Sequence, residues 1–197
     1  MKIVLASNNP DKLREVREIL EGTGIEVISQ REAGCDFEAD ENGTTFEENA
    51  RIKARAAMEA TGLVCVADDS GIEINAMGGA PGIHSARYFV ELSYAEKCHK
   101  IIENVGNNPD RGARYCCAVV CAFPNGDEIS VFGETRGTIA TEPRGTGGFG
   151  FDPIFVPEGY SATMAEITED EKNAISHRGR AFRLFAEELK KRMDIKE

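Results

Sequence analysis

Two consecutive carboxylates, Asp68 and Asp69, follow a short apolar run that begins at Leu63. Such a run is typical of a strand buried on both faces, so we expect the acids at its carboxyl end, where open α/β sheets bind ligands. Adjacent buried carboxylates repel each other, and a divalent cation or a lysine is expected beside them. The alternative is a strand-ending turn, because Asp, Ser and Gly are ordinary turn residues.

A helix that precedes this strand carries a lysine on its apolar face. Thr45 and Glu48 have the spacing of a capping box, which predicts a helix from there to about Ala60. On a helical wheel, Asn49 and Lys53 fall in the same arc as the apolar residues. Lysine is rarely buried without a partner, so we expect Lys53 to face the carboxylates or a phosphate. The alternative is a lysine at the rim of the core with its amine in water.

A third segment lies where the first predicted strand, Lys2 to Ala6, meets the first helix. Backbone N–H groups and the helix dipole at such a junction favour phosphate, and Lys12 adds positive charge. Asn9 followed by Pro10 is also typical of an ordinary helix cap, and the Walker A spacing is absent. The phosphate contacts predicted in this segment are Ser7, Asn8, Asn9, Pro10, Asp11 and Lys12.

Two segments of the last third have features of a binding site for a planar base. Glycines surround Phe149 between Gly147 and Gly150, which leaves room for a flat ring to stack, although a glycine-rich bend is the alternative. His177 and Arg178 place positive charge at the start of the terminal helix, where the dipole favours anions, and this indicates a bound ligand. The alternative is a pair of solvated charges.

The elements that must position these residues alternate as strand, helix and strand, which is typical of an α/β fold. The second strand is predicted at Glu26 to Ser29, before an acidic loop from Asp36 to Gly43. Asn125-Gly126 joins two strand-like runs, 114–123 and 128–135, and predicts an antiparallel hairpin and hence a mixed sheet. The buried face predicted for the terminal helix consists of Ala181, Phe182, Phe185 and Leu189.

Composition excludes several classes of protein. The chain has 197 residues, of which 41% are hydrophobic and 29% charged, as expected for a single globular domain over 1–197. A net charge of −11 without a basic run argues against long nucleic acid, whereas a small phosphorylated ligand with Mg²⁺ suits local positive charge on an acidic surface. The sequence shows no membrane span or signal peptide, so we expect a cytoplasmic protein.

The cysteines and histidines do not form a recognisable reactive centre. None of the six cysteines has Cys-x-x-Cys spacing, and we expect reduced, mostly buried thiols, with Cys117 and Cys121 on one strand face with Val119. The chain contains neither a Gly-x-Ser-x-Gly elbow nor a His-Glu-x-x-His motif. Serine hydrolase and zinc protease chemistry are therefore disfavoured.

Taken together, six segments resemble the inosine/xanthosine triphosphate pyrophosphatase family over nearly the whole chain. Each is ambiguous alone, but their order and spacing are specific to that family. The segments are Ser7-Asn8-Asn9 with Lys12, Thr45 to Ala50 with Lys53, Ala67 to Gly71, Gly78 to Gly82 with Ser85 to Tyr88, Gly147 to Pro153, and Ser176 to Gly179. Family members often carry Gly within the first loop, where this chain has Asn8 or Asp11.

The resemblance implies an elongated mixed β-sheet flanked by helices, with two lobes around a central cleft, and a homodimer. It implies Mg²⁺-dependent cleavage of non-standard purine nucleoside triphosphates (ITP, dITP and XTP) to the monophosphate and pyrophosphate. Asp69 resembles the general base and metal-linked carboxylate, Lys53 the second catalytic group, and either Asp40 or Glu41 the other metal-side acid. The remaining substrate contacts that it implies are Ser7 to Lys12, Asn49, Ser70 and Lys172, with Phe149, Gly150, Phe151, Asp152, His177 and Arg178 on the base side.

The sequence leaves two other functions open. One is a pyrophosphatase for other modified or pyrimidine nucleotides, and the other is a nucleotide sensor that binds without turnover. In the enzyme hypothesis, lysines and Mg²⁺ hold the triphosphate while Asp69 orients or deprotonates a water that attacks the α-phosphorus. Donors aimed at a 6-keto oxygen would reject adenine, because one donor would be left unpaired.

Overall fold

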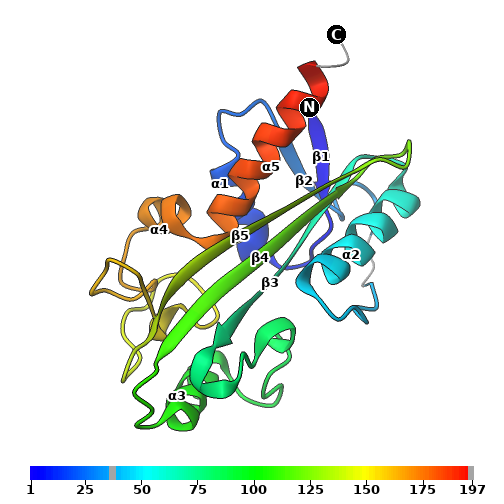
Figure 1. Cartoon of the computed structure of the whole chain (residues 1–197). Coiled ribbons are helices and arrows are strands. Elements are labelled where there is room, and N and C mark those ends of the chain that lie inside the picture. The colour runs from blue at the N-terminus through cyan, green and yellow to red at the C-terminus, as the bar shows by residue number, and fades with distance from the viewer. Residues whose placement is uncertain (36–38, 195–197) are drawn as a thin grey trace. The chain divides into compact units, whose positions relative to one another are not determined.

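The structure is a computed structural model that describes residues 1–35 and 39–194. The predicted acidic loop, Asp36 to Gly43, therefore begins outside the described residues. Within them the strands are β1 (Lys2–Leu5), β2 (Glu26–Ser29), β3 (Cys65–Ile74), β4 (Gly112–Ala122), β5 (Glu128–Ile139) and β6 (Phe155–Pro157). They form one sheet in the order β2-β1-β3-β4-β5-β6, in which the long strands β4 and β5 lie side by side (Figure 1).

The sheet is mixed, and the predicted α/β class is confirmed. Strand β1 pairs in parallel with β2 and with β3, whereas β5 and β6 are antiparallel. The predicted hairpin turn is present, since Phe123 N–H donates to the Asp127 carbonyl at 3.0 Å. The helices within the described residues are α1 (Pro10–Ile19), α2 (Phe46–Thr61), α3 (Tyr94–Val105), α4 (Glu169–Ile175) and α5 (His177–Asp194).

Strand β3 continues through the acidic pair, so the prediction that the strand ends there was wrong. The strand runs to Ile74, and both Asp68 and Asp69 lie within it. The apolar run ends at Ala67, but backbone pairing does not depend on the polarity of the side chains. Two buried carboxylates are tolerated in the strand because each has a cationic partner.

The chain divides into two compact units, each with its own core. Unit 1 comprises 1–69, 117–133 and 178–197, and unit 2 comprises 70–116 and 134–177. The core of unit 2 is a cluster that includes Ile72, Ile101, Ile139, Ile154 and Phe155. Within the described part of the chain, no helix is long and apolar enough to cross a membrane.

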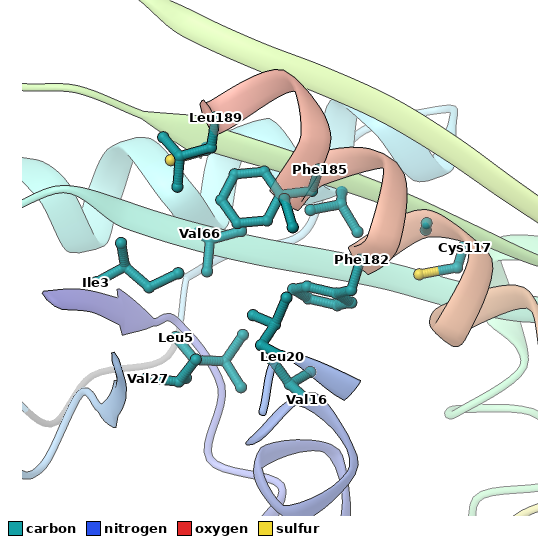
Figure 2. Close-up of a cluster of buried hydrophobic side chains, with 14 of the residues drawn as sticks. Ile3, Leu5, Val16, Leu20, Val27, Val66, Cys117, Phe182, Phe185 and Leu189 are labelled. Carbon is teal, nitrogen blue, oxygen red and sulfur yellow. The ribbon is translucent and has the colours of Figure 1, made fainter. Parts of the chain in front are cut away.

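The core of unit 1 joins helix α5 to α1 and the first strands. Figure 2 shows Phe182 of α5 close to Val16 of α1 and to Leu20, which follows that helix, and Phe185 close to Val66 of β3. The predicted buried face of the terminal helix is confirmed, because Phe182 and Phe185 are 0% exposed. Cys117, Val119 and Cys121 belong to this cluster as predicted, and the cysteines of the described residues are free thiols.

Candidate active site

Helix α2 brings a lysine and an amide to Asp69 in unit 1. Lys53 Nζ lies 3.2 Å from Asp69 Oδ1 and 3.3 Å from Glu41 Oε1. Asn49 Nδ2 donates to Asp69 Oδ2 at 3.2 Å. Because Asn49 and Lys53 are four residues apart on one helix, they share a face. The predicted approach of Lys53 to the carboxylates is confirmed.

The start of α2 fixes the position of this face. Thr45 caps the helix by accepting from Glu48 N–H at 3.1 Å, while the Glu48 carboxylate accepts from the Thr44 N–H at 2.6 Å. The reciprocal hydrogen bond expected at Thr45 is therefore made one residue earlier. Asn49 Oδ1 accepts from Gly43 N–H at 2.9 Å, which ties the preceding loop to the helix. The Asn49 amide thus connects that loop with Asp69.

The surroundings of Asp69 shift the pKa of its carboxyl in opposing ways. Burial raises the pKa of Asp69 above its ordinary value of 3.8, and Glu41 adds to this, while the charges of Lys53 and Lys12 oppose it. Burial would lower the pKa of Lys53, but the carboxylates of Asp69, Asp68 and Glu41 outweigh it, so the pKa is raised. A charged lysine therefore lies beside a carboxylate whose basicity is increased.

Asp68 points to a different set of partners in unit 1. Its Oδ2 lies 3.0 Å from Lys12 Nζ and 3.3 Å from Arg178 Nη2, and Arg178 Nη1 lies 2.6 Å from Glu15 Oε2. Asp68, Glu15 and Arg178 are each 2% exposed or less. Burial alone would lower the pKa of Arg178, but Asp68 and Glu15 raise it. The positive charge at the start of α5 is therefore balanced by the carboxylates of Asp68 and Glu15. A contact of Arg178 with a base stays a prediction.

Glu15 is a member of this cluster that sequence reasoning missed. It lies on α1 three residues after Lys12 and directly before the buried Val16. A glutamate is rarely buried unless it is paired. Its position on the inner side of α1 was the available signal, but its partner Arg178 lies 163 residues away in the sequence.

The loop before α1 has the predicted cap. Asn9 Oδ1 accepts from the N–H groups of Asp11 and Lys12 at 2.9 and 3.2 Å, and Pro10 is the first helical residue. Ser7 Oγ accepts from Asn9 N–H at 3.2 Å. Capping leaves Lys12 free to extend from the first turn to Asp68, so the cap and the cationic site occur together. Phosphate binding by this loop stays a prediction.

Unit 2 holds a second cluster around Asp152. Asp152 Oδ2 accepts from Lys172 Nζ at 2.7 Å and from Phe149 N–H at 2.8 Å, and Lys172 Nζ lies 4.8 Å from the centre of the Phe149 ring. Gly148 has a φ of +65°, and a Cβ there would lie 2.1 Å from Asp152 Oδ2. Lys172, predicted as a phosphate contact, thus lies among the residues predicted for the base.

Two tyrosines that the sequence analysis did not single out support this cluster. Tyr115 stacks on His177 with ring centres 4.6 Å apart, and Tyr94 of α3 meets Phe151 edge-on at 5.7 Å. Tyr115 is buried in the core of unit 2, and burial raises its pKa well above 10.0. The sequence contained no signal for these contacts, because both rings lie far along the chain from their partners. Ser70, a further predicted contact, follows Asp69 in β3 and belongs to unit 2.

Asp69 and Glu41 are the residues that fit a divalent cation. Both carboxylates lie within 3.3 Å of Lys53 Nζ, and Mg²⁺ is commonly bound by one or two carboxylates together with phosphate oxygens and water. Among residues 1–35 and 39–194, no group of three or more His, Cys, Asp or Glu side chains could hold a metal by itself. Of the two predicted acids, Glu41 is the one with a contact to Lys53.

Comparison with known proteins assigns the chain to a family. Residues 3–188 match the model of the Ham1 family. The chain belongs to the Ham1 family. The resemblance to inosine/xanthosine triphosphate pyrophosphatases is confirmed, since a Yersinia pestis protein named dITP/XTP pyrophosphatase is 44% identical over 96% of this chain and 98% of its own length.

Solved Ham1 proteins have the same fold. The Ham1 protein of Staphylococcus aureus is 37% identical, with a TM-score of 0.87 over 98% of this chain and 100% of that one. The Ham1 protein of Coxiella burnetii is 41% identical, with a TM-score of 0.87 over 97% of this chain and 99% of that one. The mixed sheet of this chain is therefore the Ham1 fold.

Proposed function

We propose that this Ham1 protein is a hydrolase that cleaves non-standard purine nucleoside triphosphates, dITP, XTP and ITP, to the monophosphate and pyrophosphate. The observation that carries the proposal is the Asp69–Lys53 pair, because it places a buried carboxylate that can orient or deprotonate water beside a cation that can neutralise phosphate charge. The names of the relatives support the substrate class.

In this proposal the residues of unit 1 act on the triphosphate. Asp69 orients or deprotonates the attacking water, and Lys53 and Lys12 hold phosphate oxygens. Attack of the water oxygen at the α-phosphorus breaks the bond to the bridging oxygen and releases pyrophosphate, while the water proton passes to Asp69. The ion pairs of Lys12 with Asp68 and of Lys53 with Asp69 keep both amines in place before substrate binds.

The proposal includes Mg²⁺ as the cofactor, bound by Asp69 and Glu41. When bound, the ion supplies charge neutralisation on the phosphate oxygens. Lys53 lies between the two carboxylates and reduces their mutual repulsion in the absence of a cation. Calorimetric titration with MgCl₂ tests which acid binds the ion. The wild type is compared with Glu41→Gln, and Asp40→Asn is the matched control.

The unit 2 cluster is the proposed base-recognition set. Phe149 supplies a ring for stacking, and the Asp152–Lys172 pair supplies an acceptor and a donor at fixed positions. A donor aimed at the 6-keto oxygen of hypoxanthine or xanthine would be left unpaired by adenine, which has an amino group there. Such an unpaired donor can lower kcat/KM for the adenine nucleotide by orders of magnitude. His177 is a proposed member of this set, and a base contact by Arg178, which belongs to unit 1, is proposed in addition.

A single assay tests the function. Release of pyrophosphate is measured with ITP, dITP, XTP and the common nucleotides, with and without Mg²⁺. We expect pyrophosphate and monophosphate as first products, and activity that favours the non-standard purines. Orthophosphate with nucleoside diphosphate as first products would contradict attack at the α-phosphorus. Preference for a pyrimidine nucleotide would contradict the proposed purine substrate class.

The variant Asp69→Asn separates an enzyme from a sensor. An amide cannot take the proton, so turnover should fall by about 10²- to 10⁴-fold while nucleotide binding persists. A chain that binds dITP and releases no pyrophosphate, with Asp69 intact, would be a sensor. A homodimer and a cytoplasmic location are also part of the proposal, and light scattering of the purified protein tests the first.

A further inference from the structure

Asn8 and Gln30 are joined by a hydrogen bond between their side chains. Gln30 Nε2 donates to Asn8 Oδ1 at 2.6 Å, although the residues lie 22 positions apart in the sequence. Gln30 is only 3% exposed, whereas Asn8 is exposed. A buried donor therefore holds one end of an amide that faces solvent.

The parallel pairing of β1 with β2 brings the two residues together in unit 1. Leu5 pairs with Ser29, so the segments that follow these strands leave the sheet at the same edge. The turn after β2 is itself fixed, since Cys35 N–H donates to the Gln30 carbonyl at 2.8 Å and the Glu32 carboxylate accepts from Ser29 N–H at 2.6 Å. Gln30 thus has a fixed position before any ligand binds.

The orientation of the Asn8 amide decides whether it attracts or repels a phosphate. Its oxygen only accepts hydrogen bonds and its NH₂ group only donates, and a phosphate oxygen requires a donor. Because the oxygen and the NH₂ group are separate branches of one planar amide, the bond from Gln30 to the oxygen directs the NH₂ group elsewhere. The first turn of α1, directly after this loop, contains Lys12, whose charge favours an anion.

We propose that Gln30 is a positioning residue that keeps the NH₂ group of Asn8 available to donate to a phosphate of the substrate. The inference rests on the proposed function and deepens it by naming a residue that acts on the substrate only through Asn8. Without Gln30 the amide rotates, presents its oxygen to the phosphate part of the time, and loses binding.

A double-mutant cycle with Gln30→Met and Asn8→Ala tests this role. Methionine keeps the buried volume of Gln30 but cannot donate, and Asn8→Ala alters an exposed side chain that is outside the core. We expect Gln30→Met to raise KM for dITP by about tenfold, the scale of one charge-assisted hydrogen bond, with kcat nearly unchanged. In the Asn8→Ala background, Gln30→Met should have almost no further effect.

A matched control and a readout besides activity accompany the cycle. Ser29→Ala removes the hydroxyl contact to Glu32 in the same turn and should leave KM unchanged, with Tm measured for every variant. Calorimetry with inorganic tripolyphosphate should show the same loss of affinity in Gln30→Met as the kinetics.

The outcomes separate the two proposals. If the wild type is active and Gln30→Met raises KM equally in both backgrounds, the positioning role is overturned while the function stands. The same holds if the kinetic losses of Gln30→Met are accounted for by a lowered Tm. If the wild type releases no pyrophosphate from any nucleotide, the proposed function is overturned, and the inference with it.

Discussion

Asp68 and Asp69 are consecutive residues of β3, yet their carboxylates contact different partners. Asp68 binds Lys12 and Arg178, whereas Asp69 binds Lys53 and Asn49. Successive side chains of a strand point to opposite faces, so one backbone segment serves two clusters. The repulsion expected between adjacent acids is thereby reduced by separation as well as by the paired cations.

The pH dependence of activity should reflect the raised pKa of Asp69. A general base must be ionised, so kcat/KM should fall as pH decreases through the pKa of Asp69, which burial raises and the charge of Lys53 lowers. Lys53→Met removes a positive charge that lowers this pKa, so the limb of its residual activity should move to higher pH. Lys53→Arg keeps the charge and is the control. Equal acid limbs in wild type and Lys53→Met would contradict the assignment of Asp69 as the base.

Asp68 should contribute to stability more than to the chemical step. In Asp68→Asn the buried Arg178 loses one of its carboxylates, and removal of one partner of a buried ion pair costs about 3 kcal/mol. Urea unfolding measures the loss. Glu188→Gln removes one partner of the exposed pair with Lys191 and should leave the midpoint unchanged. Equal midpoints for wild type and Asp68→Asn would show that the Arg178 cluster adds nothing to stability.

Gly148 should be essential to the Asp152–Lys172 pair. An alanine Cβ at this position would lie 2.1 Å from Asp152 Oδ2 and 3.0 Å from Lys172 Nζ. We expect Gly148→Ala to cost about 1–3 kcal/mol beyond backbone strain, the range for overpacking, and to lower kcat/KM. Gly159→Ala is the matched control, because Gly159 has a similar φ of +85° with nothing within 4 Å of its Cβ. If both variants lose equal stability in urea, the crowding at Asp152 does not matter.

The buried cysteines should resist alkylation at neutral pH. Burial raises the pKa of Cys98 to about 11 and of Cys116 and Cys121 to about 12. The thiolate is the nucleophile, and at pH 8 its fraction would be about 0.1% or less at these three positions. Mass spectrometry after iodoacetamide treatment should find Cys35, which is only partly buried, modified first, and all six in urea. Fast modification of Cys116 in the native protein would show that unit 2 opens locally.

Much of the local structure was predictable because its causes lie within a few residues of the sequence. The cap at Asn9, the strand Glu26–Ser29, the helix that carries Lys53, and the apolar face of α5 depend on short-range spacing and on neighbouring residues. The end of β3 was predicted incorrectly, because local polarity indicated a turn where cationic partners from other elements allow the strand to continue.

The sequence by itself determined the family, most of the elements and many of the residues with chemistry. Only the tertiary structure decided which of them are partners: Glu15 with Arg178, Gln30 with Asn8, and Tyr115 with His177. These contacts join residues 163, 22 and 62 positions apart, so no local pattern encodes them. The physical reason is that a buried charge or amide is stable only beside its complement, and the packing of helices and strands determines which complement lies within reach.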